Sequence, residues 1–465
     1  MKLHQISLAI LSLAAGAAQA LTPTFVVNLD GATAVGKSVV DVAKAMCKPD
    51  IVIGSVTTSF TQVYQGGPGN KISGVYCNGV NTTNSGIADP TTKLWISKNN
   101  VDGSLETFVR AINQLALTTV LDPASCPTPV FSSVVQTCST IGVNANGGFS
   151  DVEDTIWKAR GAFVQGPGYL TISGFAGQGF GVAVSDKLYA ALQLAQGLTG
   201  SDVANQPNIT KQQFTSILNS AGAYHTDWTP FLGKGAPGPT NNQGVTTNLT
   251  LVTALPSATN NMNLCRRTDA SGTQAGMEVY FLNNPCAAAD PTFGKLSAVL
   301  GIDTAGTFKV IENAGTGDVK TCLNAHNQNL VNAAVKADGT AADEYAIGIM
   351  SLENTPVFPN DHWHFVKLDG VSPTPDASQR QTVIDGKYNY AFESQFAYRT
   401  DPITNDAPHV NFMKKFIALM GDPSKVNPLV GIFSVPGASL YSSFPTRVHR
   451  GSTGGNSCSP FSLAE

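Results

Sequence analysis

Three segments of the chain repeat one local pattern that constrains the fold more than any other feature. Each begins with a short apolar run, passes through a turn that contains glycine and a serine or threonine, and continues with apolar residues at helical spacing. The segments are residues 25–46, 94–115 and 264–282. Such strand–turn–helix units predict an α/β fold with mostly parallel strands. Their turns should meet at the carboxyl edge of the sheet, where open α/β sheets bind ligands.

The N-terminus predicts export. Residues 1–20 combine the basic Lys2, an apolar run over residues 6–15 and the sequence Ala18-Gln19-Ala20, which is typical of a secretory signal peptide and its cleavage site. We therefore expect a periplasmic or extracellular protein. The apolar run is shorter than the ~20 residues that span a bilayer, and no later segment reaches that length, so we expect no membrane insertion.

The length and charge of the chain limit its class of function. With 465 residues, the chain exceeds the ~250–300 residues over which a single core keeps growing, which predicts two domains or lobes. The net charge of −4 and the charged fraction of 13% provide no electrostatic basis for binding nucleic acid. A bound anion would therefore have to be held by specific geometry.

The eight cysteines predict disulfides. An even number in an exported chain favours disulfides over metal ligands or catalytic thiols. The sequence leaves their pairing open, although bonds between neighbours, Cys126 with Cys138 and Cys265 with Cys286, are the simplest hypothesis. The second of these bonds would bracket the turn that follows the third apolar run.

That turn, "RTDASGT", has two interpretations. In one, Arg267, the hydroxyls of Ser271 and Thr273 and the free backbone N–H groups near Gly272 bind an anion at a helix N-terminus. In the other, Asp269, Ser271 and Thr273 only cap the helix that follows. Taken alone, the stretch favours the capped helix, because such caps are common.

The order of several motifs resembles the phosphate-binding proteins of ABC transporters, which have the type II solute-binding fold. "RTDASGT" at residues 267–273 is similar to the anion-binding motif of the second lobe in that family, and it is the most specific match. "DGATA" at residues 30–34 is similar to the first anion-binding turn, and "GGFSDVED" at residues 147–154 to the turn that carries a Ser-Asp pair. The resemblance covers most of the chain after residue 20.

The resemblance implies two α/β lobes with a ligand cleft between them. Lobe one would comprise residues 21–184 and 346–465, and lobe two residues 185–345. The ligand would be phosphate or a related oxyanion, the partner would be an ABC permease, and no cofactor, metal or catalysis is implied. The implied ligand-binding residues are Thr33, Ala34, Ser104, Ser150, Asp151, Arg267, Ser271, Gly272 and Thr273. Because a carboxylate can only accept hydrogen bonds, Asp151 would favour a protonated oxyanion over sulfate.

The chain also departs from the family. Ala34 stands where the family has an aromatic residue, and Asp102 and Glu106 flank the turn at Ser104, where negative charge would weaken phosphate binding. These departures favour an alternative, a surface, structural or adhesion protein with a degraded ligand site. A phosphatase is a further alternative, but no nucleophile motif is present, and His362 and His364 lack an evident third metal ligand.

Overall fold

The computed structural model describes most of the chain after the predicted signal peptide. The described residues are 21–112, 117–162, 168–219, 262–286, 308–326, 345–373, 382–383, 386–401, 405–422, 432–433, 448–449, 458 and 462–463. No helix within these ranges is long and apolar enough to cross a membrane. The predicted signal peptide lies outside the described residues.

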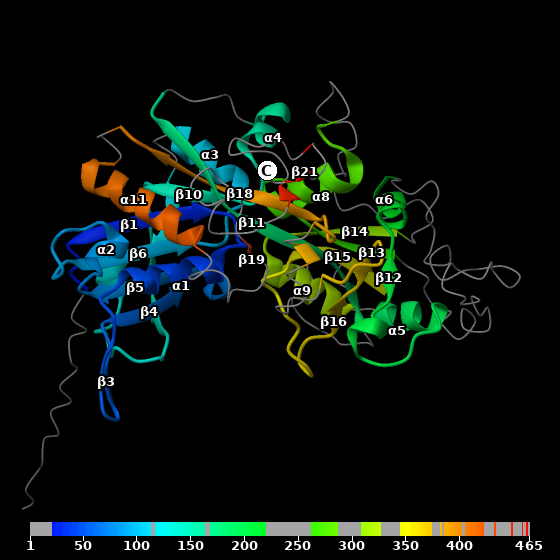
Figure 1. Cartoon of the computed structure of the whole chain (residues 1–465), viewed down its shortest axis with the longest axis horizontal. Helices are drawn as coiled ribbons and strands as arrows, with labels where there is room; N and C mark the ends of the chain where they lie inside the picture. The colour runs from blue at the N-terminus through cyan, green and yellow to red at the C-terminus, as the bar shows by residue number, and fades with distance from the viewer. Residues whose placement is uncertain are drawn as a thin grey trace, which may run out of the picture.

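One large mixed sheet runs through the molecule, with helices on its faces (Figure 1). Its main path follows the order β14-β13-β15-β11-β18-β10-β1-β6-β5-β4-β8. These strands are β14 (Phe308–Asn313), β13 (Met262–Arg267), β15 (Tyr345–Ser351), β11 (Leu170–Ser185), β18 (Ala391–Arg399), β10 (Gly147–Ser150), β1 (Phe25–Gly31), β6 (Lys93–Asn99), β5 (Ile72–Asn78), β4 (Thr61–Gly66) and β8 (Gln136–Cys138). The predicted α/β class is confirmed.

Strand β11 connects the two halves of the sheet. Its first part pairs antiparallel with β18, from Leu170 opposite Arg399 onward. Its last part pairs antiparallel with β15, with Phe180 opposite Ser351. On either side β1 pairs parallel with both β10 and β6, and β13 with both β14 and β15, whereas β5 pairs antiparallel with β4 and β6.

Three hydrophobic clusters of described residues lie against this sheet. One gathers around β1 with helices α1 (Gly36–Met46) and α11 (Ala407–Met420). The larger one gathers around β11, β13 and β15 with helices α5 (Asp186–Ala195), α8 (Gly272–Leu282) and α9 (Thr316–Ala325). A third, smaller cluster packs against β4, β5 and β6 around Tyr64 and Trp95, in the same half of the sheet as the first. Each half of the sheet thus has its own core, which gives the molecule two lobes on one sheet. The predicted lobe boundaries, after residue 184 and before residue 346, stay a prediction.

The three strand–turn–helix units form as predicted. Strand β1 leads into α1, β6 leads into α3 (Ser104–Ile112), and β13 leads into α8. Because β1 and β6 are parallel neighbours, the turns that follow them lie at the same edge of the sheet. That edge carries the candidate site described below.

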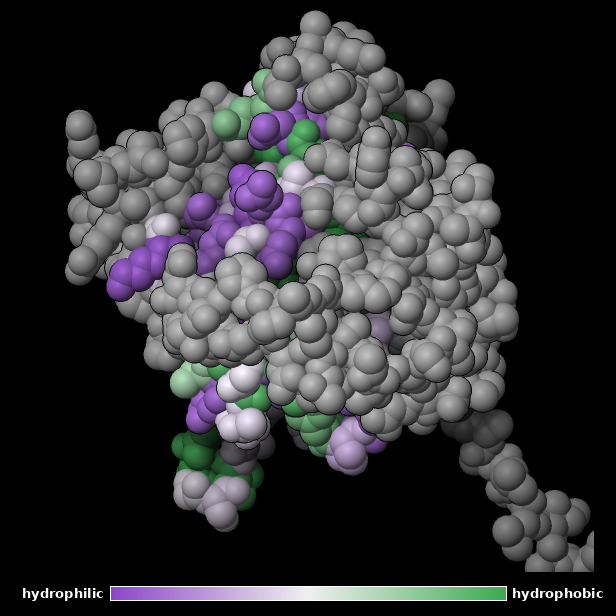
Figure 2. All heavy atoms as spheres, turned by 90° about the vertical axis from the view of Figure 1, so that its right-hand side faces the viewer, coloured by the Kyte–Doolittle hydropathy of each residue, from purple (hydrophilic) through white to green (hydrophobic). Residues whose placement is uncertain are grey.

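One hairpin stands away from both cores. Strands β2 (Ile51–Ile53) and β3 (Val56–Thr58) pair antiparallel and project from the body (Figure 1). Its apolar side chains are exposed, with Ile53 at 76%. In Figure 2, green apolar surface likewise gathers on a projection at the lower left edge of the molecule.

The disulfides confirm one predicted pair and correct the other. Cys126 bonds to Cys138 as expected. The predicted bond between Cys265 and Cys286 is wrong, because Cys265 bonds to Cys322 on α9. The partners of the remaining bonds are Cys47 with Cys77 and Cys286 with Cys458.

The topology of the second lobe explains this correction. Strand β13 lies between β14 and β15, so the connection from β13 to β14 and the connection from β14 to β15 run in opposite directions across the sheet. Since such connections between parallel strands are right-handed, helices α8 and α9 cover opposite faces. Cys265 faces α9, whereas Cys286 follows α8 on the other face. Closeness in sequence therefore does not bring the two cysteines together.

Removal of the Cys265–Cys322 bond tests its contribution to stability. Replacing both cysteines by serine should lower the free energy of unfolding by about 4 kcal/mol, because the bond closes a loop of 57 residues in the unfolded chain. The corresponding change at Cys126 and Cys138, which close 12 residues, should cost about 3 kcal/mol. Guanidinium denaturation measures both values, and a peptide joining Cys265 to Cys286 in a non-reducing digest would contradict the assignment.

Candidate functional site

Turns from both lobes meet at the carboxyl edge of the sheet. The backbone N–H of Leu105, in the first turn of α3, donates to the carbonyl oxygen of Ala270 in the turn before α8, at 3.1 Å. A Cβ atom on Gly103 would lie 2.2 Å from that same oxygen, and one on Gly272 would lie 2.3 Å from Ser104 Oγ. Glycine at these two positions allows the two turns to touch.

Arg267, at the end of β13, connects the two lobes. It is only 2% exposed. Its Nη1 donates to Thr33 Oγ1 before α1, at 3.1 Å, and to Thr316 Oγ1 at the start of α9, at 3.2 Å. Its Nη2 donates to the carbonyl oxygen of Ala314 at 2.9 Å. Its Nε has no hydrogen-bond partner within the described part of the chain.

Burial lowers the pKa of Arg267 to about 10, against the attraction of Asp151 and Asp318. The guanidinium therefore keeps its charge at neutral pH. A buried cation with one unpaired donor is a suitable partner for an oxyanion.

Asp151, after β10, is the carboxylate of the site. It is 1% exposed, and its Oδ2 accepts a hydrogen bond from Thr273 Oγ1 at 3.3 Å. Its backbone N–H donates to Ser104 Oγ at 3.1 Å. Its Oδ1 is buried without a hydrogen-bond partner among the described residues. Burial raises the pKa of Asp151 to about 6, although Arg267, Thr273, Lys98 and Ser104 all oppose that shift.

The structure also bears on the two interpretations of "RTDASGT". Ser271 is the N-cap residue of α8, yet within that fully described helix start its side chain makes no capping hydrogen bond. Asp269 instead pairs with Arg266 at 2.9 Å, and Thr273 donates to Asp151. Ser271 therefore does not cap the helix with its side chain, and Asp269 and Thr273 make these other contacts.

Two of the predicted site residues have other surroundings. The Ser150 hydroxyl donates to the carbonyl oxygen of Val152 at 2.6 Å and accepts from Trp157 Nε1 at 3.3 Å. Ala34 is buried and packs in the larger hydrophobic cluster. Their contact with a ligand stays a prediction, as it does for the other seven residues.

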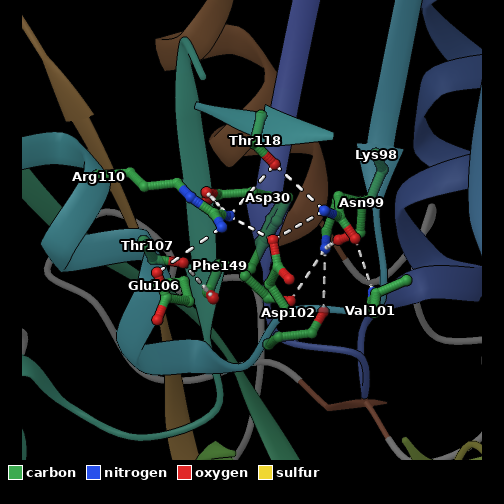
Figure 3. Close-up of polar contacts among 12 residues, drawn as sticks. Asp30, Lys98, Asn99, Val101, Asp102, Glu106, Thr107, Arg110, Thr118 and Phe149 are labelled. Carbon is green, nitrogen blue, oxygen red and sulfur yellow. Dashed lines mark hydrogen bonds and ion pairs between the residues drawn. The ribbon is translucent and has the colours of Figure 1, made fainter. Parts of the chain in front are cut away.

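The acidic residues near Ser104 are engaged by a cation that sequence reasoning missed (Figure 3). Arg110 Nη1 lies 2.5 Å from Asp102 Oδ2 and 2.9 Å from Asp30 Oδ2. Arg110 Nη2 lies 3.7 Å from Glu106 Oε2. The predicted repulsion between these acidic groups and a bound anion is thus reduced by Arg110, which lies one helical turn beyond Glu106. That spacing is a recognisable ion-pair signal in the sequence.

Lys98 is a second buried cation that the sequence analysis did not identify. It is 1% exposed, and its Nζ donates to the carbonyl oxygens of Gly31, Ala32 and Asn99 at 3.3, 3.1 and 2.5 Å. Burial lowers the pKa of Lys98 to about 8, while nearby carboxylates oppose the shift. These hydrogen bonds fix the backbone of the turn that precedes Thr33. The sequence feature that indicates this buried cation is a lysine within the apolar strand segment "KLWISKN".

A cleft of about 570 Å³ opens beside the buried residues. It is lined from both lobes. The residues on one side are Thr33, Gly36, Lys37, Val40, Asp41, Gly69, Asn70, Lys71, Ser73 and Asn100, and those on the other are Gly315, Thr316, Gly317, Glu353 and Asn354. Thr33 and Thr316, the two hydroxyls that accept from Arg267, belong to its wall. Of the nine predicted site residues, Thr33 is the one that lines this cleft.

Ion pairs and hydrogen bonds join the two walls of the cleft. Lys71 Nζ lies 2.9 Å from Asp318 Oδ2 across it. Lys37 Nζ donates to the Glu353 carbonyl oxygen at 3.0 Å, and Ser38 Oγ donates to Glu353 Oε1 at 2.5 Å. Burial raises the pKa of Glu353 to about 8, so this carboxyl is largely neutral at pH 7.

The histidines considered as metal ligands lie elsewhere, at strand β16 (Trp363–Phe365). His362 Nδ1 and His364 Nε2 contact the two oxygens of Asp186 at 3.0 and 2.9 Å. Sequence reasoning had not found Asp186, which is distant in the chain. No group of three or more metal-ligating side chains in the described ranges is arranged to hold a metal ion.

Comparison with known proteins identifies similar solved structures only. The chain matches no known protein-family model. No curated protein matches it in sequence. A protein described as a phosphate ABC transporter substrate-binding protein with bound phosphate, from Clostridium perfringens, is 13% identical with a TM-score of 0.42, and the match covers 88% of this chain and 100% of that one.

Two further solved structures are similar at the same low level. A possible phosphate-binding protein from Planctomyces limnophilus is 12% identical with a TM-score of 0.34, over 91% of this chain and 96% of that one. PstS from Borrelia burgdorferi is 11% identical with a TM-score of 0.35, over 89% of this chain and 99% of that one.

The role of Arg110 can be tested by removing its charge. Arg110→Met should lower the free energy of unfolding by about 3 kcal/mol, because it leaves the carboxylate of Asp30 buried and unpaired. Adding Asp30→Asn should restore part of that loss. Urea denaturation of the parent, both single variants and the double variant measures the coupling. Unchanged stability of Arg110→Met would contradict the structural role.

Proposed function

We propose that the chain is an exported solute-binding protein that holds phosphate or a related tetrahedral oxyanion between its two lobes. The observation that carries this proposal is the pair of buried, incompletely bonded groups at the lobe junction, Nε of Arg267 and Oδ1 of Asp151. One is a charged donor and the other an acceptor. Both belong to groups that are too costly to bury without partners.

The chemistry of this pair suits a protonated oxyanion. Arg267 would neutralise the charge of the anion and donate to its oxygens. Asp151 would accept a hydrogen bond from a P–OH group, which fully deprotonated sulfate lacks. Helices α3, α8 and α9 begin around these residues and add the partial positive charge of their N-termini.

The alternative of a surface or structural protein with a degraded ligand site has less support. One argument for it was the negative charge of Asp102 and Glu106, which would repel an anion. Both carboxylates contact Arg110, which reduces that repulsion. Its remaining basis is Ala34, which replaces an aromatic residue. The proposal includes export because a signal peptide is predicted, and it includes delivery to an ABC permease because the order of the motifs resembles that of such binding proteins.

Loss of the Arg267 charge tests the proposal directly. Titration calorimetry of ligand-stripped protein should show orthophosphate binding to the parent and at least about 100-fold weaker binding to Arg267→Met, since a charge-assisted contact is lost. Arg266→Met is the matched control, because Arg266 is equally buried but pairs with Asp269 and Glu312. It should keep phosphate binding. Absence of heat with the folded parent would contradict the proposal.

Asp151→Asn tests the selection against sulfate. An amide can donate as well as accept, so the variant should bind orthophosphate about tenfold more weakly and sulfate more tightly than the parent. Titration with each anion at pH 7 gives the ratio of the two dissociation constants. A ratio equal to that of the parent would exclude the acceptor role of Asp151.

The same variant should alter the pH dependence of stability. In the folded parent the pKa of Asp151 is raised to about 6, so the native state keeps a proton that the unfolded chain loses near pH 4. The folded parent is therefore destabilised as the pH rises from about 4 to about 6. Asp151→Asn lacks this effect, and its stability relative to the parent should increase over that window by up to about 3 kcal/mol. Denaturation at pH 4, 6 and 8 measures the difference.

A further inference from the structure

The cleft beside Arg267 is larger than an inorganic oxyanion requires. Its volume of about 570 Å³ corresponds to roughly 19 water molecules at about 30 Å³ each. A tetrahedral oxyanion has only five atoms besides hydrogen. A volume of this size lies within the range of about 300–1,000 Å³ that is usual for organic ligands. Room therefore remains after the anion is bound.

Most residues that line the cleft have polar side chains, although most of the surface that they present to it is carbon. Its hydroxyl and amide side chains come from both lobes and include Ser73, Asn100, Thr316 and Asn354. Among its described lining residues Val40 is the one apolar side chain. These hydroxyl and amide groups can form hydrogen bonds with a ligand that carries hydroxyls.

One side chain in the wall has an unused acceptor. Asn100 Nδ2 donates to Ser73 Oγ at 3.3 Å. Its Oδ1 is buried and has no hydrogen-bond partner within the described ranges. Because this oxygen has no exposed surface, a hydroxyl in the cleft can reach it only after the side chain of Asn100 rotates.

We propose that this cleft holds the small, hydroxyl-bearing organic group of a phosphate monoester, whose phosphoryl group lies at Arg267. The proposal rests on the proposed function and specifies its ligand class. The continuity of the two regions supports it, because Thr33 and Thr316 both line the cleft and accept hydrogen bonds from Arg267. Lys37 and Lys71 also line the cleft, together with the acidic Asp41 and Glu353, and Lys71 pairs with Asp318.

Gly317 provides a way to fill the cleft without disturbing Arg267. It lines the cleft within α9, and a Cβ atom built on it would meet nothing within 4 Å. Gly317→Leu should therefore fold and occupy space that the organic group needs. Gly168→Leu is the matched control, since a Cβ there also meets nothing within 4 Å and the residue does not line the cleft.

The experiment is calorimetric titration of the full mature protein and both variants with orthophosphate, glycerol 3-phosphate and glycerol. We expect the parent to bind glycerol 3-phosphate at least as tightly as orthophosphate, and not to bind glycerol alone. Gly317→Leu should weaken glycerol 3-phosphate binding about tenfold or more and change orthophosphate binding less than about threefold. Gly168→Leu should match the parent, and thermal melting verifies that each variant is folded.

Each contrary outcome has a distinct meaning. Binding of orthophosphate without glycerol 3-phosphate would overturn this inference and leave the proposed function intact. Equal effects of Gly317→Leu on both anions would also overturn it, since the organic group would not occupy the cleft. Absence of binding by either anion to the folded parent would overturn the proposed function, and this inference with it.

Discussion

The arrangement of the lobe junction depends on the burial of one guanidinium. Arg267 lies at the end of β13 in the second lobe and contacts Thr33 of the first lobe, Thr316 and the Ala314 carbonyl oxygen. A cation removed from water must recover its lost hydration through fixed polar groups. The turns that supply those groups are therefore held in a defined position relative to one another. The same turns provide the donors and acceptors of the candidate site.

A second set of buried charged residues fixes the turns of the first lobe that border the site. Lys98 binds the carbonyl oxygens of Gly31 and Ala32, and Arg110 joins Asp30 to Asp102. These pairs lie on β1, β6 and α3, whose ends form one wall of the site. Buried ion pairs contribute little net stability, but they define a single arrangement of the groups that they connect. In this protein, the contacts of Lys98 orient the turn that carries Thr33, and the contacts of Arg110 direct the acidic side chains toward its guanidinium.

The continuous sheet gives these turns a common frame. Strand β11 pairs with β18 in one lobe and with β15 in the other, so both halves share one hydrogen-bonded ladder. The cleft between the lobes is crossed by the Lys71–Asp318 pair and by the contacts of Lys37 and Ser38 with Glu353. The Lys71–Asp318 pair is partly exposed and can exchange with water more readily than the packed cores can, whereas the Ser38–Glu353 contact is buried.

The sequence by itself determined the local units and the polar groups that they carry. The period of apolar residues predicted the strand–turn–helix segments, and the motif "RTDASGT" indicated Arg267 and its neighbours, because both signals depend only on nearby residues. The even number of cysteines likewise predicted disulfides. Only the tertiary structure decided that Cys265 bonds to Cys322, since right-handed connections place α8 and α9 on opposite faces. It also decided that Asp102 and Glu106 face Arg110, and that Lys98 lies under the first turn, because the direction of a side chain depends on elements that are distant in sequence.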